Sequence, residues 1–354
     1  MRIDRRRFLQ LSAAGTGAWL TGSGCGRERQ SGISRDPVVI IGAGLAGLQA
    51  ANILKKAGRQ VVVLEARSGP GGRVQTIREP FDDGLYGEAG PIRIAGSHKT
   101  VLRLAQEFGL SLVPFDSSNG SALTAIQGMR FRSDTFDKIK VPLKLRPDEQ
   151  GLRPNLLLDR YAGSLSGDLA IVNPSPAMYR EWKAIDAVTW PNWLRSRGAS
   201  DAAVKLMTLG GDSSELSALY VLRQLALLRG TTYYKIQGGM DLLPRALVSA
   251  VRDRVRYNSA VVRIDQTAEP VRIDYVENGR MLNLNASHVI VTTPLSTLKS
   301  IEVQPPFSRA KEKAIQDIPY FPATRFLLQS RSRFWQASQL SGYARTDQPA
   351  EMWD

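Results

Sequence analysis

Cysteine and histidine are almost absent from this sequence of 354 residues. The single cysteine, Cys25, excludes disulfides within the chain, cysteine-ligated iron–sulfur clusters and a paired-thiol redox relay. Two histidines, His98 and His288, are too few for a His-rich metal centre and leave little room for serine–histidine or cysteine–histidine catalysis. We therefore expect no metal site, and we expect any chemistry to come from a bound cofactor.

Runs of basic residues interleaved with aromatics are also missing beyond residue 30, although the formal net charge is +14. Nucleic-acid binding usually needs such a concentrated patch, whereas dispersed charge is typical of a solvated surface. We therefore expect no nucleic-acid partner. Hydrophobic residues make up 43% of the chain, which indicates folded domains, about two at this length.

The first 25 residues are predicted to be an export signal. Arg2 and Arg5–Arg7 precede an uncharged, weakly apolar stretch that is too short and polar for a comfortable membrane span. The segment Arg5–Gln10 resembles the twin-arginine (Tat) signal of bacteria. We expect the Tat machinery as a partner and the periplasm or extracellular space as the location, with residues 26–35 as a linker.

Two alternatives stay open for Cys25. It closes the apolar stretch as the acylated cysteine of a lipoprotein signal does, which would make the chain a membrane-anchored lipoprotein. Gly22, however, occupies the position where such signals usually carry leucine, which favours cleavage nearby or an inert cysteine.

A dinucleotide-binding unit is predicted after the linker. The apolar run Val38–Ile41 is typical of a buried parallel strand and leads into the motif G-A-G-L-A-G at residues 42–47. A helical pattern and a second apolar strand, Val61–Leu64, follow, and Glu65 comes 23 residues after Gly42. Glycines at this spacing allow a tight turn, a close approach of the backbone to a pyrophosphate, and close helix–strand packing. A carboxylate at the position of Glu65 can bind the ribose hydroxyls of an adenosine.

Residues 65–73, E-A-R-S-G-P-G-G-R, resemble the signature E-A-x-x-x-x-G-G-R of the flavin amine oxidase superfamily. The resemblance implies that this loop contacts FAD and that Arg73 lies near its pyrophosphate. FAD is therefore the expected cofactor, since a soluble NAD enzyme has no use for such a loop.

Residues 86–94, Y-G-E-A-G-P-I-R-I, resemble the G-P-M-R segment of L-amino acid oxidases, which runs beside the flavin ring in that family. The resemblance implies that Arg93 binds the substrate carboxylate, and a guanidinium fork does this with two parallel hydrogen bonds. Such anchoring would hold the α-carbon over the flavin N5 for hydride transfer. An interior ion pair of Arg93 with Glu88 or another carboxylate, or a contact with an FAD phosphate, stays open.

The middle of the chain carries little chemistry of its own. Helical stretches over residues 176–230 include Trp182, Trp190 and Trp193, which would either line a substrate pocket or form core, and their spacing favours core. Residues 234–244 resemble the pattern G-G-M-D-x-L-P of the same family. That resemblance implies a return to the dinucleotide domain, where the residue matching Val261 touches the adenine end of FAD through its backbone.

A lysine in this family lies nine residues before the Phe of a Phe-Trp pair and bonds a water at the flavin N5. Here the pair is Phe334-Trp335, and the matching position holds Arg325. Arg325 is the candidate catalytic residue, although arginine is larger and forked. A structural arginine in an edge strand is the alternative.

The sequence stops after Met352-Trp353-Asp354, whereas amine oxidases continue with an A-G-E motif on an FAD-contacting strand. A truncated, inactive remnant of the family, or one fragment of a split protein, is therefore an open alternative to an active enzyme.

Together these patterns predict an α/β fold, a Rossmann-like FAD-binding domain with an interleaved α+β substrate domain. The predicted segments are a Tat signal at 1–25, a linker at 26–35, the FAD-binding domain at 36–115 and 236–300, a largely helical substrate domain at 116–235, and a truncated further part of the substrate domain at 301–354. The resemblance implies FAD-dependent oxidative deamination of an L-amino acid by O₂, with a polyamine or other amine oxidase as the alternative. The expected FAD-binding residues are Gly42, Gly44, Leu45, Ala46, Gly47, Glu65, Ala66, Arg67, Gly72, Arg73, Gly90, Pro91, Ile92, Arg93 and Val261.

Overall fold

The computed structural model describes residues 36–115, 122–163, 169–211, 213–320, 323–347 and 351–353. The predicted export signal, Cys25 and the linker lie outside these residues. By internal contacts the chain divides into two compact units. The first unit comprises residues up to Ile92, Leu104–Leu110 and Ile236–Phe326, and the second comprises Arg93–Arg103, Ser111–Lys235 and Leu327–Asp354. The domain boundaries drawn from the sequence remain predictions.

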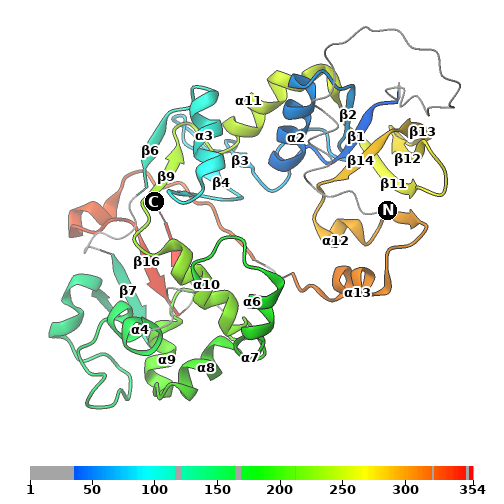
Figure 1. Ribbon diagram of the computed structural model, residues 1–354. Coiled ribbons are helices and arrows are strands. Elements are labelled where there is room, and N and C mark those ends of the chain that lie inside the picture. Colours follow the sequence, from blue (N-terminus) through cyan, green and yellow to red (C-terminus); the bar gives the residue numbers. More distant parts are fainter. Residues whose placement is uncertain are drawn as a thin grey trace, which may run out of the picture. The chain divides into compact units, whose positions relative to one another are not determined.

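A four-stranded sheet with strand order β10-β2-β1-β14 organises the first unit (Figure 1). Neighbouring strands are parallel, and every residue of β1 is buried, as expected for a strand covered on both faces. Helix α2 connects β1 to β2 and packs against α11. The elements are β1 (Val38–Ile41), α2 (Leu45–Lys56), β2 (Val61–Leu64), α11 (Leu242–Val251), β10 (Val255–Arg256) and β14 (His288–Val291).

A second sheet in the first unit has the order β13-β12-β11-β15. Strands β12 and β13 form a hairpin whose turn, Asn278-Gly279, has φ values of 50° and 79°, as a type I′ turn requires. The pairing of β11 with β12 shifts register between Val261 and Arg263, which marks a β-bulge. The bounds are β11 (Ser259–Asp265), β12 (Val271–Glu277), β13 (Arg280–Ala286) and β15 (Glu302–Gln304). Smaller elements of this unit are β3 (Thr76–Ile77), β4 (Gly87–Glu88), the 3₁₀ helix η3 (Arg252–Arg254), α12 (Leu295–Leu298) and α13 (Arg309–Asp317).

Short helices predominate in the second unit. Ser175, Ser200 and Ser217 begin three of them, and each serine side chain accepts a hydrogen bond from a backbone N–H of the first turn. The helices are α4 (Pro154–Ala162), α6 (Pro176–Glu181), α7 (Lys183–Asp186), α8 (Trp190–Ser196), α9 (Asp201–Met207) and α10 (Ala218–Leu228), with 3₁₀ helices η1 (Ser133–Lys138) and η4 (Phe334–Ser338). The strands are β5 (Ile94–Ala95), β6 (Leu112–Pro114), β7 (Leu123–Ile126), β8 (Met129–Arg132), β16 (Ala344–Thr346) and β17 (Glu351–Met352). Helix α3 (Lys99–Glu107) and strand β9 (Tyr233–Ile236) have residues in both units.

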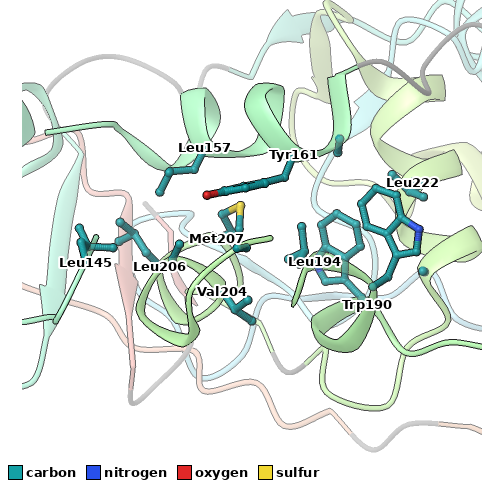
Figure 2. Close-up of a cluster of buried hydrophobic side chains, with 14 of the residues drawn as sticks. Leu145, Leu157, Tyr161, Trp190, Leu194, Val204, Leu206, Met207 and Leu222 are labelled. Atoms are coloured by element: carbon teal, nitrogen blue, oxygen red, sulfur yellow. The ribbon is translucent and has the colours of Figure 1, made fainter. Parts of the chain in front are cut away.

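The hydrophobic core of the second unit lies among these helices. Figure 2 shows Leu157 and Tyr161 of α4 facing Leu206 and Met207 of α9. The three tryptophans of the helical region, Trp182, Trp190 and Trp193, are buried in this core. This confirms the prediction from their spacing that they form part of the hydrophobic core. None of the helices in the described part of the chain has the length and apolarity needed to cross a bilayer.

Within the second unit, the fully buried carboxylate of Glu149 connects several elements through hydrogen bonds. It accepts hydrogen bonds from the Tyr161 hydroxyl (2.8 Å), from the backbone N–H (3.0 Å) and hydroxyl of Ser200, and from the backbone N–H of Arg146 (3.0 Å). Burial alone would raise the pKa of Glu149, but the hydrogen bonds from Ser200, Tyr161 and Arg146 outweigh it and hold this pKa at about 2. The carboxylate therefore links α4 and α9 in its ionised form.

Replacing Glu149 by glutamine should destabilise the second unit by about 3 kcal/mol, because the amide brings N–H donors to a place already filled with donors. The pKa of Glu149 in the folded protein is about 2, below the ordinary value of 4.5. The ionised carboxylate therefore stabilises the fold fully at pH values above 4.5, and this stabilisation is lost as the pH falls from 4.5 toward about 2. Melting temperatures recorded across that range should show the wild type losing its advantage over Glu149→Gln as acid is added. The exposed Glu181→Gln is the matched control, and equal melting curves for the two variants would contradict this account.

Candidate functional site

The turn between β1 and α2 is shaped for close approach by a ligand. Gly42 has φ +103°, and a Cβ on Gly47 would lie 2.0 Å from the carbonyl oxygen of Gly42, so a side chain fits at neither position. A Cβ on Gly44 would instead meet nothing within 4 Å. The space beside Gly44 is therefore open, as the approach of a pyrophosphate to this backbone requires.

The start of α2 presents backbone donors to this space. Gly44 is the N-cap residue and makes no side-chain cap, and the first turn carries no acidic residue. The N–H groups of the first turn, at Leu45 and Ala46 among others, have no partner within the helix. Together with the helix dipole, these groups favour an anion at this end of α2.

The second glycine-rich loop lies on the first. The Gly71 N–H donates to the Ala43 carbonyl (2.9 Å), and Gly71 forms a parallel bridge with Gly44. The Arg67 guanidinium donates to the Gly72 carbonyl (3.0 Å). The motif at 42–47 and the loop at 65–73, which sequence reasoning assigned separately to FAD, therefore form one structure.

A cavity of about 430 Å³ adjoins this loop, within the size range of small-molecule sites. Two guanidinium groups line it, and they would complement a doubly charged pyrophosphate. At its edge a Cβ on Gly90 would lie 2.1 Å from the Arg73 carbonyl oxygen, so the G-P segment passes directly over the loop. The lining residues are Arg67, Gly72, Arg73, Gln75, Ala89, Gly90 and Pro91.

Glu65 follows β2 and is buried. One of its carboxylate oxygens accepts from the Ala43 N–H (2.7 Å) and the other from the Arg67 N–H (2.9 Å). A carboxylate has about four acceptor positions, so two remain for ribose hydroxyls. The Ser259 N–H donates to the Glu65 carbonyl (2.8 Å), which brings β11, the strand of Val261, to this end of β2.

These features fit FAD. The open space at Gly44, the uncapped helix start, the two guanidinium groups and the spare acceptors of Glu65 match a pyrophosphate and an adenosine ribose. In contrast, no group of three or more His, Cys, Asp or Glu side chains among the described residues could hold a metal ion.

A partly buried hydrogen-bond network around Glu88 and Asp241 was not predicted. Both carboxylate oxygens of Glu88 are used, one by the Met240 N–H (2.8 Å) and the other by the Thr76 hydroxyl (2.9 Å). Burial raises the pKa of Glu88 despite these bonds. The Arg78 guanidinium binds Asp241 through two hydrogen bonds, at 2.9 and 2.8 Å. The only hint in the sequence was the G-G-M-D pattern, which contains Met240 and Asp241.

Arg325 reaches the same segment. Its Nη1 donates to the carbonyl of Glu88 and to that of Gly90 (2.6 Å). The residue lies in a segment without regular secondary structure, so the edge-strand alternative does not describe it. In this structure Arg325 holds the backbone that carries Gly90, and its catalytic role stays a prediction.

Arg93 belongs to the second unit. Its Cζ lies 4.7 Å from the ring centroid of Tyr233 and 4.9 Å from that of Trp353. Strand β5 pairs with β9, and this pairing carries Tyr233 to the position beside Arg93. The two rings were not predicted, because nothing in the local sequence connects them with Arg93.

Comparison with known proteins gives consistent results. The family model "Flavin containing amine oxidoreductase" matches residues 45–354. A model of the C-terminal domain of alanine dehydrogenase/PNT matches residues 10–79, which include the first glycine motif.

Two relatives are described as L-amino-acid oxidases. YobN of Bacillus subtilis (strain 168) carries this description provisionally. It is 32% identical to this chain over 327 residues, and the match covers 88% of this chain and 67% of YobN. The L-amino-acid oxidase of Vipera ammodytes ammodytes is 32% identical over 326 residues, covering 88% of this chain and 66% of its own length. The chain thus spans about two thirds of the length of these relatives.

Solved structures share the fold. Putrescine oxidase bound to putrescine has a TM-score of 0.69 at 23% identity, covering 90% of this chain and 72% of its own. Cyclohexylamine oxidase from Brevibacterium oxydans IH-35A has a TM-score of 0.66 at 24% identity, covering 88% of this chain and 70% of its own. With the parallel sheet of the first unit, this likeness confirms the predicted α/β, Rossmann-like fold.

Proposed function

Because this chain belongs to the flavin-containing amine oxidoreductases, with FAD as its cofactor, we propose that it oxidises an L-amino acid. In the balanced reaction, an L-amino acid, O₂ and water give a 2-oxo acid, ammonia and H₂O₂. The observation that carries the proposal is Arg93, the arginine of the G-P-I-R segment, which forms no ion pair with any other described residue. Its guanidinium donors are therefore left for the carboxylate of an amino acid.

The residues have separate tasks. When bound, FAD would supply the two-electron oxidation of the substrate, with O₂ as the final electron acceptor. The backbone at Gly44 and the guanidinium groups of Arg67 and Arg73 would hold the pyrophosphate of FAD, and Glu65 would accept hydrogen bonds from its ribose. Arg93 binds the substrate carboxylate and thereby orients the α-carbon for oxidation.

A comparison of two ligands tests this function directly. Turnover of L-phenylalanine and of 2-phenylethylamine, which lacks the carboxylate, is measured by peroxide release from the FAD-loaded protein. The proposal predicts turnover of the amino acid and little of the amine. Equal turnover of both compounds, or turnover of a diamine such as putrescine instead, would contradict the proposal. Either result would favour the alternative activity, that of a polyamine or other amine oxidase.

Arg325 offers a test of how the cavity is built. Arg325→Ala frees the Glu88–Gly90 backbone and should raise the dissociation constant for FAD about tenfold, whereas Arg325→Lys, which can still reach a carbonyl, should raise it about threefold. Titration of flavin fluorescence measures both, with the exposed Arg309→Ala as the control. An unchanged FAD affinity in Arg325→Ala combined with a lower kcat would assign Arg325 to the reaction itself.

The proposal also includes export through the Tat system into the periplasm or extracellular space. Its support is the arginine run Arg5–Arg7 ahead of an uncharged stretch. Fractionation of cells expressing the wild type and a variant in which Arg5–Arg7 are lysines tests it, and equal export of both would contradict it.

A further inference from the structure

The surroundings of Arg93 form an aromatic cluster that we call the Arg93 clamp. It consists of Arg93, the two rings that touch its Cζ, Tyr233 and Trp353, and the rings of Tyr343 and Phe115. The Trp353 ring lies 4.3 Å from that of Tyr343 and 5.5 Å from that of Phe115, measured between centroids. All five residues belong to the second unit.

The rings are themselves held in place. The Tyr343 hydroxyl accepts from Arg345 Nε (2.6 Å) and donates to Glu351 Oε1 (3.1 Å). Glu351 and Arg345 belong to the paired strands β17 and β16, and Tyr343 immediately precedes β16. Tyr233 is held by the pairing of β9 with β5. Tyr233 therefore lies within a strand and Tyr343 directly before one, and the ring of Trp353 packs against that of Tyr343.

Within the clamp, the positive charge of the Arg93 guanidinium is not paired with a carboxylate of the described residues. Among the described residues, Arg93 is in contact with rings and forms no ion pair, and the carboxylate of the cluster, Glu351, is directed to Tyr343 and Arg345. A second cation, Lys235, lies with its Nζ 5.9 Å from the centroid of the Phe115 ring. A ligand at this cluster should therefore be an anion.

Ring contacts restrain an arginine without using its hydrogen bonds. A cation over an aromatic face is attracted by the ring, while its N–H groups stay available in their own plane. A free arginine side chain loses rotamer entropy when a ligand fixes it, and an arginine restrained by rings has already lost most of this entropy. Removing a ring should therefore weaken the binding of a carboxylate without affecting a ligand that has none.

We propose that Trp353 and Tyr233 are positioning residues, which hold Arg93 for the carboxylate and so set the preference for amino acids over simple amines. The inference rests on the proposed function, in which Arg93 binds that carboxylate.

The test compares two replacements of Trp353 that keep apolar bulk. Trp353→Phe retains a ring, and Trp353→Leu does not. Isothermal titration of the FAD-supplemented protein with 3-phenylpropanoate, which is L-phenylalanine without its amine, measures carboxylate binding independently of turnover. The control is Tyr179→Leu, which removes a ring 5.7 Å from another arginine, Arg223, in the same unit.

The dissociation constant should rise about tenfold in Trp353→Leu and about threefold or less in Trp353→Phe, and should be unchanged in Tyr179→Leu. KM for L-phenylalanine should follow the same order with little change in kcat. KM for 2-phenylethylamine, where turnover is measurable, should not change. Tyr233→Leu should behave as Trp353→Leu does, which provides a second variant if Trp353→Leu fails to fold.

Three outcomes would overturn the inference. If Trp353→Leu and Tyr233→Leu bind 3-phenylpropanoate as the wild type does, while Arg93→Ala does not bind it, the clamp is wrong and the role of Arg93 stands. If Trp353→Leu weakens the amine and the carboxylate equally, the ring has a general structural role. If the wild type itself does not bind the carboxylate, the inference falls together with the proposed function.

Discussion

A Gly44→Ala variant should fold as the wild type does and lose about a hundredfold in affinity for FAD. The backbone of Gly44 has φ −75° and ψ 176°, which alanine adopts without strain, and a Cβ there meets no protein atom within 4 Å. The methyl group would therefore occupy only the open space that the pyrophosphate needs. Equilibrium dialysis with FAD measures the affinity, and circular dichroism with a melting curve measures the fold.

Alanine variants of two other glycines distinguish an effect on FAD binding from an effect on folding. Gly47→Ala places a Cβ 2.0 Å from the Gly42 carbonyl oxygen and should lower the melting temperature as well as FAD binding. Gly163→Ala, in helical conformation with its nearest neighbour 3.9 Å from the new Cβ, should change neither. If Gly44→Ala retains FAD with the affinity of the wild type, the pyrophosphate does not lie at this turn.

An Arg93→Ala variant should lose about a thousandfold in kcat/KM for L-amino acids, because about 4 kcal/mol is typical when one partner of a bound charge pair is removed. Turnover of 2-phenylethylamine, however slow, should be the same as in the wild type. Arg93→Lys should recover only part of the loss, since an ammonium group cannot form the two parallel hydrogen bonds of a guanidinium.

The flavin content of each variant is the necessary control, because a loss of cofactor would lower both activities together. The exposed Arg180→Ala serves as the matched control for a lost positive charge in the second unit. If Arg93→Ala retains full flavin content and loses equal activity toward the amino acid and the amine, Arg93 does not bind the substrate carboxylate.

Much of the first unit could be predicted because its signals are local. The apolar runs at 38–41 and 61–64 became β1 and β2 at those positions, with the glycine turn and α2 between them. Asn278-Gly279 forms a hairpin turn, because positive φ at both positions suits these residues. In each case a few consecutive residues determine the structure.

The contacts that position the site could not be predicted in this way. The bond from Met240 to Glu88 joins residues 152 positions apart, and neither residue type demands the other. The rings beside Arg93 come from β9 and from the residue after β17, so only the paired strands bring them together. Arg325 was assigned by its spacing from Phe334-Trp335, and that spacing gives no indication that it bonds the backbone of Glu88 and Gly90.

The most direct test of the account is the flavin content of the purified chain. The visible absorption spectrum, followed by denaturation and quantification of the released flavin, gives the ratio of FAD to protein. The geometry of the turn at Gly44, the cavity at Arg73 and the carboxylate of Glu65 predict about one FAD per chain. Protein that is folded and binds no FAD, even after incubation with an excess of it, would contradict the account.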